Sequence, residues 1–222
     1  MGAVPADAYG QFTISDKQKE QMYDEKNIDT EEANHLLFFC HYSNPAFILI
    51  TIPLILNIKT SIIVLVSHYI SSIFLAILIK NKFKHKDTII INNTNKKNLS
   101  NILITSINKS VDSLLIIAGI IITFYLISTI IIIIINPNSY LSSIIKGLLE
   151  ITSGIEALKT INLNQTYKTI ITTCFLSFGG LSIHLQTKSY LIDTDIDFSY
   201  FYIGRIYQTI ISGIICSILL SY

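Results

Sequence analysis

The sequence predicts an all-α polytopic membrane protein in which continuous transmembrane helices are combined with interrupted or re-entrant half-helices. Half of the 222 residues are hydrophobic and only 14% are charged, whereas a soluble domain is about 25% charged. The apolar residues gather in separate stretches, at 46–58, 60–79, 111–135, 168–192 and 200–220. A helix needs about 20 apolar residues to cross a bilayer. We therefore expect a multi-pass membrane protein, with the lipid bilayer as its surroundings.

Three stretches are long and uninterrupted, and we expect whole transmembrane helices at 60–79, 111–135 and 200–220. The stretch 46–58 is too short and contains Pro53, and the stretch 168–192 is interrupted by two glycines. Residues 140–158 are amphipathic and carry charged side chains among Ile and Leu. These three are predicted as half-helices or re-entrant segments, which exist at membrane depth only when protein buries them or when they line water.

Polar sequence surrounds the apolar stretches in two places. Residues 1–37 are expected to form a water-exposed N-terminal segment with two short helices, and residues 38–222 the membrane domain. No basic region followed by an apolar stretch occurs near the start, so no cleavable signal peptide is expected. Lysines crowd residues 80–110, which predicts a cytoplasmic loop because short basic loops resist translocation. Binding of this loop to anionic lipid headgroups is an alternative reading of the same lysines.

The two interrupted stretches resemble each other, which suggests an inverted repeat. The segments HYSNPAFILI (41–50) and SFGGLSIHLQ (177–186) each break an apolar run, and a polar-aromatic cluster follows each of them in the next span. Paired interruptions in the two halves of a transporter point to a substrate site at their interface. The breaks supply four candidate residues for binding a solute: Ser43, Asn44, Gly179 and Gly180.

Glu150 is a further candidate, together with the glycines on either side of it. The i, i+3 and i+7 spacing of Gly147, Glu150 and Gly154 predicts that they share one face of a single helix. A carboxylate at membrane depth is costly unless it has a function or a buried partner. The alternative is a helix in the membrane interface, with Glu150 reaching water.

Two sets of polar residues follow the glycine break. Ser182, Gln186 and Ser189 share a helix face by their spacing, and this face would bind either a polar solute or a neighbouring helix. Arg205 is the single arginine of the chain and lies in the last span. It is expected either to snorkel to the interface or to pair with a buried carboxylate such as Glu150.

Sequence motifs carry a resemblance to a known family. The segments EEANHLLFFCHYSNPAFIL (31–49), GLLEITSGIEAL (147–158) and SFGGLSIHLQTKSYLIDTDIDFSYFYIGRIYQ (177–208) resemble the YlbJ family of sporulation integral membrane proteins. The resemblance implies a nucleoside-recognition or Gate domain in a polytopic protein of the bacterial inner (plasma) membrane of endospore formers. Family members are longer and begin with additional spans, so the chain resembles a shortened and partly eroded C-terminal portion.

The function classes follow from these observations. The first hypothesis is a transporter-like component for a small polar solute in spore formation. The alternatives are a non-transporting membrane scaffold for the spore envelope and an inert truncated paralogue. No nucleophile-base pair, metal spacing or nucleotide fingerprint occurs, so we expect no enzyme activity, no cofactor and no metal. The net charge of +1 gives no reason to expect nucleic acid as a partner. A polar route needs more helices than this chain has, which predicts a homo-oligomer or a separate membrane subunit.

Overall fold

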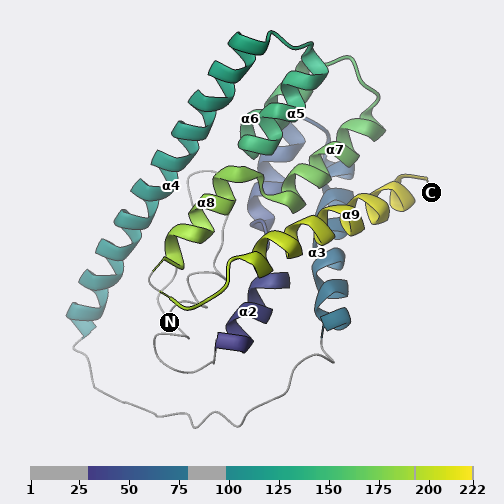
Figure 1. The fold of residues 1–222 in the computed structure, drawn as a ribbon. Helices are drawn as coiled ribbons and strands as arrows, with labels where there is room; N and C mark the ends of the chain where they lie inside the picture. Colours follow the sequence, from purple (N-terminus) through teal and green to yellow (C-terminus); the bar gives the residue numbers. More distant parts are fainter. Residues whose placement is uncertain (1–29, 80–98, 193, 222) are drawn as a thin grey trace.

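The computed structural model describes residues 30–79, 99–192 and 194–221, and every regular element in these ranges is helical (Figure 1). The first part contains α2 (Thr30–Phe39), a π-helical turn η1 (Phe47–Thr51), a 3₁₀ turn η2 (Ile52–Leu54) and α3 (Ile58–Ile79). The second part begins with α4 (Leu99–Ile135), followed by α5 (Ser139–Leu149) and α6 (Ile151–Thr160). The last three helices are α7 (Gln165–Phe178), α8 (Gly180–Tyr190) and α9 (Ser199–Ser221).

Within the described residues, four segments are long and apolar enough to cross a membrane, which confirms a polytopic all-α protein. Three of them, Ile58–Ile79, Ser106–Ile135 and Ser199–Ser221, are the whole helices that the sequence predicts. The fourth, Gln165–Tyr190, joins α7 to α8. It is interrupted where the sequence predicts, because α7 ends at Phe178 and α8 begins at Gly180.

Asparagine side chains begin several helices. The Asn138 side chain accepts a hydrogen bond from the Leu141 amide at the start of α5, and the Asn164 side chain accepts one from Thr166 at the start of α7. Asn57 does the same for the Thr60 amide at the start of α3. Short side-chain oxygens satisfy amides that have no partner within the helix. The polar residues between the apolar stretches therefore define where the helices begin.

The boundary predicted for the basic loop is partly wrong, because α4 begins at Leu99 and residues 99–110 are helical. No glycine or proline occurs between Leu99 and Gly119, so nothing in this part of the sequence stops the helix from extending before the span. Residues 80–98 lie outside the described residues. The cytoplasmic position of the loop stays a prediction.

The N-terminal segment is described only from Thr30 onward, where α2 begins. Ala33, His35 and Leu37 of α2 are buried, and the helix packs against α9 and α3. Gly204 makes this packing close, because a side chain there would collide with the Phe38 carbonyl oxygen. Residues 30–37 are thus attached to the membrane domain, whereas residues 1–29 lie outside the described part.

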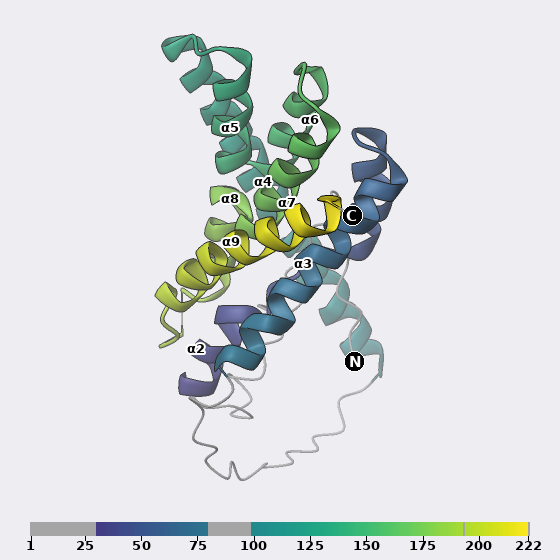
Figure 2. The same ribbon diagram turned by 90° about the vertical axis from the view of Figure 1, so that its right-hand side faces the viewer.

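The core is centred on α9, which packs along α7 and crosses α3 (Figure 2). Large apolar side chains such as Leu176 and Phe201 are fully buried there. The surfaces between these helices are rich in buried small polar residues: Ser61, Ser67, Ser71 and Ser72 on α3, Thr169, Thr172 and Thr173 on α7, and Ser212 on α9. Small residues let helices approach closely in a membrane, where apolar burial against lipid gives little advantage.

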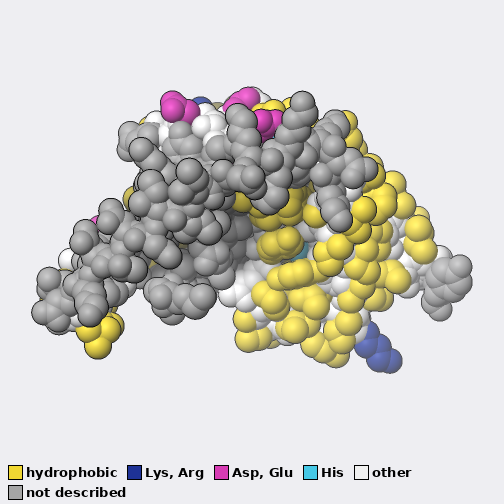
Figure 3. Space-filling model, turned by 90° about the horizontal axis from the view of Figure 1, so that it is seen from below, with side chains coloured by type: hydrophobic (Ala, Val, Ile, Leu, Met, Phe, Trp, Pro, Cys, Tyr) yellow, Lys and Arg dark blue, Asp and Glu magenta, His cyan; other side chains and the backbone are white. Residues whose placement is uncertain are grey.

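The outer surface of the described part is strongly apolar. Seen from below, hydrophobic side chains cover much of the surface that is not hidden by grey atoms (Figure 3). Along α4, Ile122, Leu126, Ile130 and Ile133 are all more than half exposed. A soluble protein rarely exposes so many large apolar side chains, and a lipid bilayer is the environment that fits them.

Candidate functional site

Helices α5 and α6 form a hairpin that turns back at Glu150. The backbone of Glu150 is extended (φ −144°, ψ 121°), so the prediction that Gly147, Glu150 and Gly154 share one face of a single helix is wrong. The glycines instead face each other across the hairpin, since a side chain on Gly154 would collide with the Gly147 Cα atom. The prediction of half-helices at 140–158 agrees with this pair of short helices.

The Glu150 side chain holds the tip of the hairpin. Its carboxylate oxygens accept hydrogen bonds from the backbone amides of Thr152 (3.0 Å) and Ser153 (2.7 Å), and the residue is 3% exposed. A carboxylate at a helix N-terminus also interacts favourably with the helix dipole. Glu150 therefore caps α6 and is buried, and the alternative in which it reaches water from an interfacial helix is not what the structure shows.

The hairpin tip packs on the glycine break between α7 and α8. Gly179 and Gly180 both have positive φ angles, of 91° and 61°, a conformation that glycine adopts without steric cost. A Cβ atom on Gly180 would lie 3.3 Å from the Leu149 carbonyl oxygen and 3.4 Å from the Gly147 carbonyl oxygen. The break thus brings backbone against backbone at the hairpin tip.

The first break, at residues 40–44, is connected to the second by His68 of α3. The Ser43 amide donates to His68 Nε2 (3.1 Å), and His68 Nδ1 lies 3.0 Å from Ser177 Oγ, two residues before the glycine pair. The neighbouring Tyr69 hydroxyl donates to the Ser43 carbonyl oxygen (3.0 Å). His68 is fully buried. We call this region, where the two breaks and the hairpin tip meet, the junction.

Arg205 and Gln208 of α9 complete the junction. Arg205 is fully buried and its Nη1 donates to the His41 carbonyl oxygen (3.2 Å). The Gln208 amide donates to the His68 carbonyl oxygen (3.2 Å) and to the Ser72 hydroxyl. The prediction that Arg205 snorkels is therefore wrong. Pairing with Glu150 is not seen either, because the described contacts of that carboxylate are the amides at the hairpin tip.

The remaining predicted residues lie around the junction. Asn44 caps the helical turn that follows the first break, since its side chain accepts from the Ala46 amide (2.8 Å). Ser182 and Gln186 are buried on α8, which packs against α4. Gln186 and Ser182 share a face as expected, whereas Ser189 is only partly buried.

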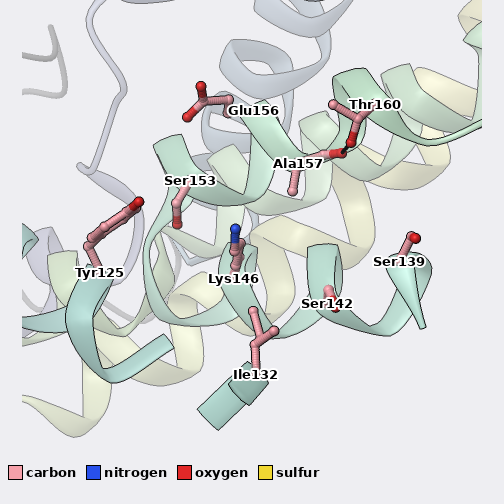
Figure 4. A pocket seen from close by; sticks show the side chains of 9 residues that line it. All are labelled: Tyr125, Ile132, Ser139, Ser142, Lys146, Ser153, Glu156, Ala157 and Thr160. Carbon is pink, nitrogen blue, oxygen red and sulfur yellow. Dashed lines mark hydrogen bonds between the residues drawn. The ribbon is translucent and has the colours of Figure 1, made fainter. Parts of the chain in front are cut away.

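A groove runs from the hairpin tip between α4 and the hairpin. One hollow of about 460 Å³ and another of about 260 Å³ share Tyr125, Ser153 and Glu156 as lining residues. Glu150 and Thr152 line the end near the tip. We call this space the hairpin groove; its wider part is lined by Tyr125, Ile132, Ser139, Ser142, Lys146, Ser153, Glu156, Ala157 and Thr160 (Figure 4).

Several of the candidate residues predicted from the sequence lie close together in the structure. Ser43, Glu150, Gly154, Gly179, Gly180 and Arg205 all contribute to the junction or to the hairpin that meets it. Ser177, Gln208 and the groove residue Lys146 were not among the predicted site residues. The polar-aromatic clusters that follow each break were the available signal for His68 and Gln208, and the charges within the amphipathic 140–158 segment were the signal for Lys146.

Comparison with known proteins gives one informative relative. No family model and no solved structure matches the chain. The chain is 23% identical, over 242 aligned residues, to the sporulation integral membrane protein YlbJ of Bacillus subtilis (strain 168). The alignment covers 91% of this chain but 59% of that protein, so the chain spans less than two thirds of the length of its relative. The similarity confirms the resemblance to YlbJ sporulation integral membrane proteins that the sequence motifs indicated.

Proposed function

We propose that this chain is a transporter-like membrane component that binds a small polar solute during spore formation. The observation that carries the proposal is the junction, at which two interrupted helices and a re-entrant hairpin meet inside an apolar helical protein. Interrupted helices place backbone groups and helix ends inside the membrane, which is costly unless those groups serve a solute or an ion. The name of the relative supplies the link to sporulation.

The junction and the hairpin groove have different parts in this proposal. At the junction the break residues are bonded to one another, and it joins the hairpin tip to the broken helices. The hairpin groove is open and lined by hydroxyl and charged groups. It begins at Glu150, at the tip that packs on the glycine break. A solute bound in the groove would therefore contact the hairpin directly.

The test replaces the chromosomal gene by variants in a sporulating host. Gly180→Val should separate the hairpin tip from the glycine break, and the number of heat-resistant spores should fall while membrane insertion persists. Uptake of a panel of labelled polar solutes into sporulating cells should fall in the same strain. Normal spore numbers in the Gly180→Val strain, at normal protein level, would remove the proposal.

One observation favours a second candidate, a membrane scaffold without transport. His68 bonds the two breaks to each other. Polar groups that have their hydrogen-bond partners within the protein are also what a rigid structural element needs. A scaffold predicts that Gly180→Val lowers spore numbers while the uptake of every tested solute is unchanged. The two measurements together separate the candidates.

A further inference from the structure

The hairpin groove contains two opposite charges that do not pair with each other. Lys146 of α5 and Glu156 of α6 both line its wider part. In Figure 4 the Lys146 ammonium group points toward α6 between Ser153 and Ala157, whereas the Glu156 carboxylate points away from it. Within the described part of the chain neither side chain forms an ion pair or a hydrogen bond through its charged group. The groove thus presents separated positive and negative groups.

The two charges differ from an ordinary surface ion pair, because they share one groove but do not contact each other. A few charged and polar groups placed along a groove are what fixes and selects a small ligand. Lys146 is only partly exposed and Glu156 is exposed, and both lie on a hairpin flanked by the apolar helix α4. A solute that carries both charges would satisfy both groups at once, whereas a solute with a single charge would leave one of them without a partner.

Hydroxyl groups and volume restrict the solute further. Tyr125 and Ser142 add neutral hydrogen-bonding groups to the wide part of the groove. At the narrow end the Thr152 hydroxyl is buried and has no hydrogen-bond partner among the described residues. The volume of about 460 Å³ lies in the range of about 300–1,000 Å³ usual for small-molecule sites.

We propose that the hairpin groove binds a small zwitterionic solute of the amino-acid type. Its carboxylate lies at Lys146, its ammonium group lies at Glu156, and hydroxyl groups of the groove bond its polar atoms. This assignment names the solute class and rests on the proposed function. Because binding is measured on the purified chain, its failure is distinguishable from a failure of the proposed role in sporulation.

The experiment measures binding to the full chain, purified in detergent, by isothermal titration. The probes are free amino acids of different side-chain size, their N-acetyl derivatives, which lack the ammonium charge, and their amides, which lack the carboxylate. The wild-type chain should bind a free amino acid about tenfold or more tightly than either derivative, because charge-assisted hydrogen bonds are the strong ones. Lys146→Gln should bind the free amino acid and its amide equally well but should still discriminate against the N-acetyl derivative. Glu156→Gln should bind the free amino acid and its N-acetyl derivative equally well but should still discriminate against the amide.

Lys159→Gln is the matched control, since Lys159 is exposed at the end of α6 and does not line the groove. It should leave all affinities unchanged. Equal affinities for free and blocked probes would overturn the assignment, and so would the absence of binding by every probe at millimolar concentration. The assignment would also be overturned if both groove variants weakened binding equally for every probe. In that case the two charges would not bind opposite ends of the solute.

Discussion

The two helix interruptions are built by different means. The break between α7 and α8 is made by the backbone of Gly179 and Gly180, both at positive φ. The break at residues 40–44 has no positive φ angle, and side chains hold it: Asn44 caps the following turn, and His68 and Tyr69 bond Ser43. One break is therefore specified locally, and the other depends on residues of α3 and α9.

This difference predicts how each break responds to substitution. A glycine at positive φ tolerates almost no other residue, so damage to the second break should be complete in a single step. The hydrogen bonds at the first break are separate and individually modest, about 0.6–2 kcal/mol between membrane helices. It should weaken gradually as its partners are removed one at a time.

The largest effect is expected for Gly180→Val. Valine is strained at φ 61°, by about 1–2 kcal/mol for the left-handed conformation alone, and its side chain would press on the carbonyl oxygens of Gly147 and Leu149. Spore formation should be lost, and the apparent melting temperature of the purified chain should fall.

Gly119→Val is the control for this prediction. Gly119 lies in α4, and a Cβ atom there meets no atom within 4 Å, so the same substitution should have little effect on either measurement. If Gly180→Val behaved like Gly119→Val, the glycine pair would be an ordinary packing contact and the comparison between the two breaks would fail.

A smaller effect is expected for His68→Leu. The change removes both ring nitrogens and leaves the Ser43 amide and the Ser177 hydroxyl without these partners. A buried polar group that loses its partner costs about 1–3 kcal/mol. The measurement is denaturant unfolding of the purified chain in mixed micelles, with Ser110→Ala as control because the Ser110 hydroxyl bonds only within α4.

A double-mutant cycle sharpens this prediction. Ser177→Ala alone should cost less than His68→Leu, and in the double variant the two costs should not add, because both changes remove the same hydrogen bond. Strict additivity would show that His68 does not connect the two breaks.

Local sequence signals account for much of the fold, and tertiary contacts account for what they missed. The spans around α3, α4 and α9 and the interruption at Gly179 follow from hydropathy and glycine alone. The break at Glu150 does not, because GLLEITSG contains no proline and reads as one helix. The chain turns there because the hairpin packs on Gly180 and the carboxylate caps α6.

Arg205 shows the same limit at the site. One of its partners is the His41 carbonyl oxygen, 164 positions away in the sequence, and no periodicity within one helix identifies such a partner. The composition of the last span indicated only that a buried or interfacial arginine needs an explanation. The pairing of the first break with α9 therefore required the three-dimensional structure.

A moderate effect on function, without a large effect on stability, is expected for Gln186→Leu. Gln186 is 3% exposed on α8, and leucine keeps the size and helix propensity but removes a donor and an acceptor. Gln186 does not line the hairpin groove, so this variant tests the separate hypothesis that the polar face of α8 binds a solute. That hypothesis predicts fewer heat-resistant spores at unchanged protein level. Ser189→Ala, at a partly exposed position of the same helix, should have no effect. Normal spore numbers for Gln186→Leu would assign this face of α8 to packing.

The smallest effect is expected for Asn44→Ala, at the side-chain cap of the first break. The Asn44 oxygen accepts from the Ala46 amide in a partly exposed position, and loss of such a cap costs about 1 kcal/mol. Asn44→Asp keeps an acceptor at the same place and should restore most of the lost stability, as measured by denaturant unfolding.

Asn164→Ala, which removes the equivalent cap of α7, provides the matched comparison in the other interrupted segment. The two alanine variants should lose similar stability, because each cap acts only on its own helix turn, whereas spore formation should suffer more from Asn44→Ala, since that turn leads directly into the junction. Equal spore numbers in the two strains would mean that the first break does not depend on its side chains, and the contrast with the glycine break would then have to rest on His68 alone.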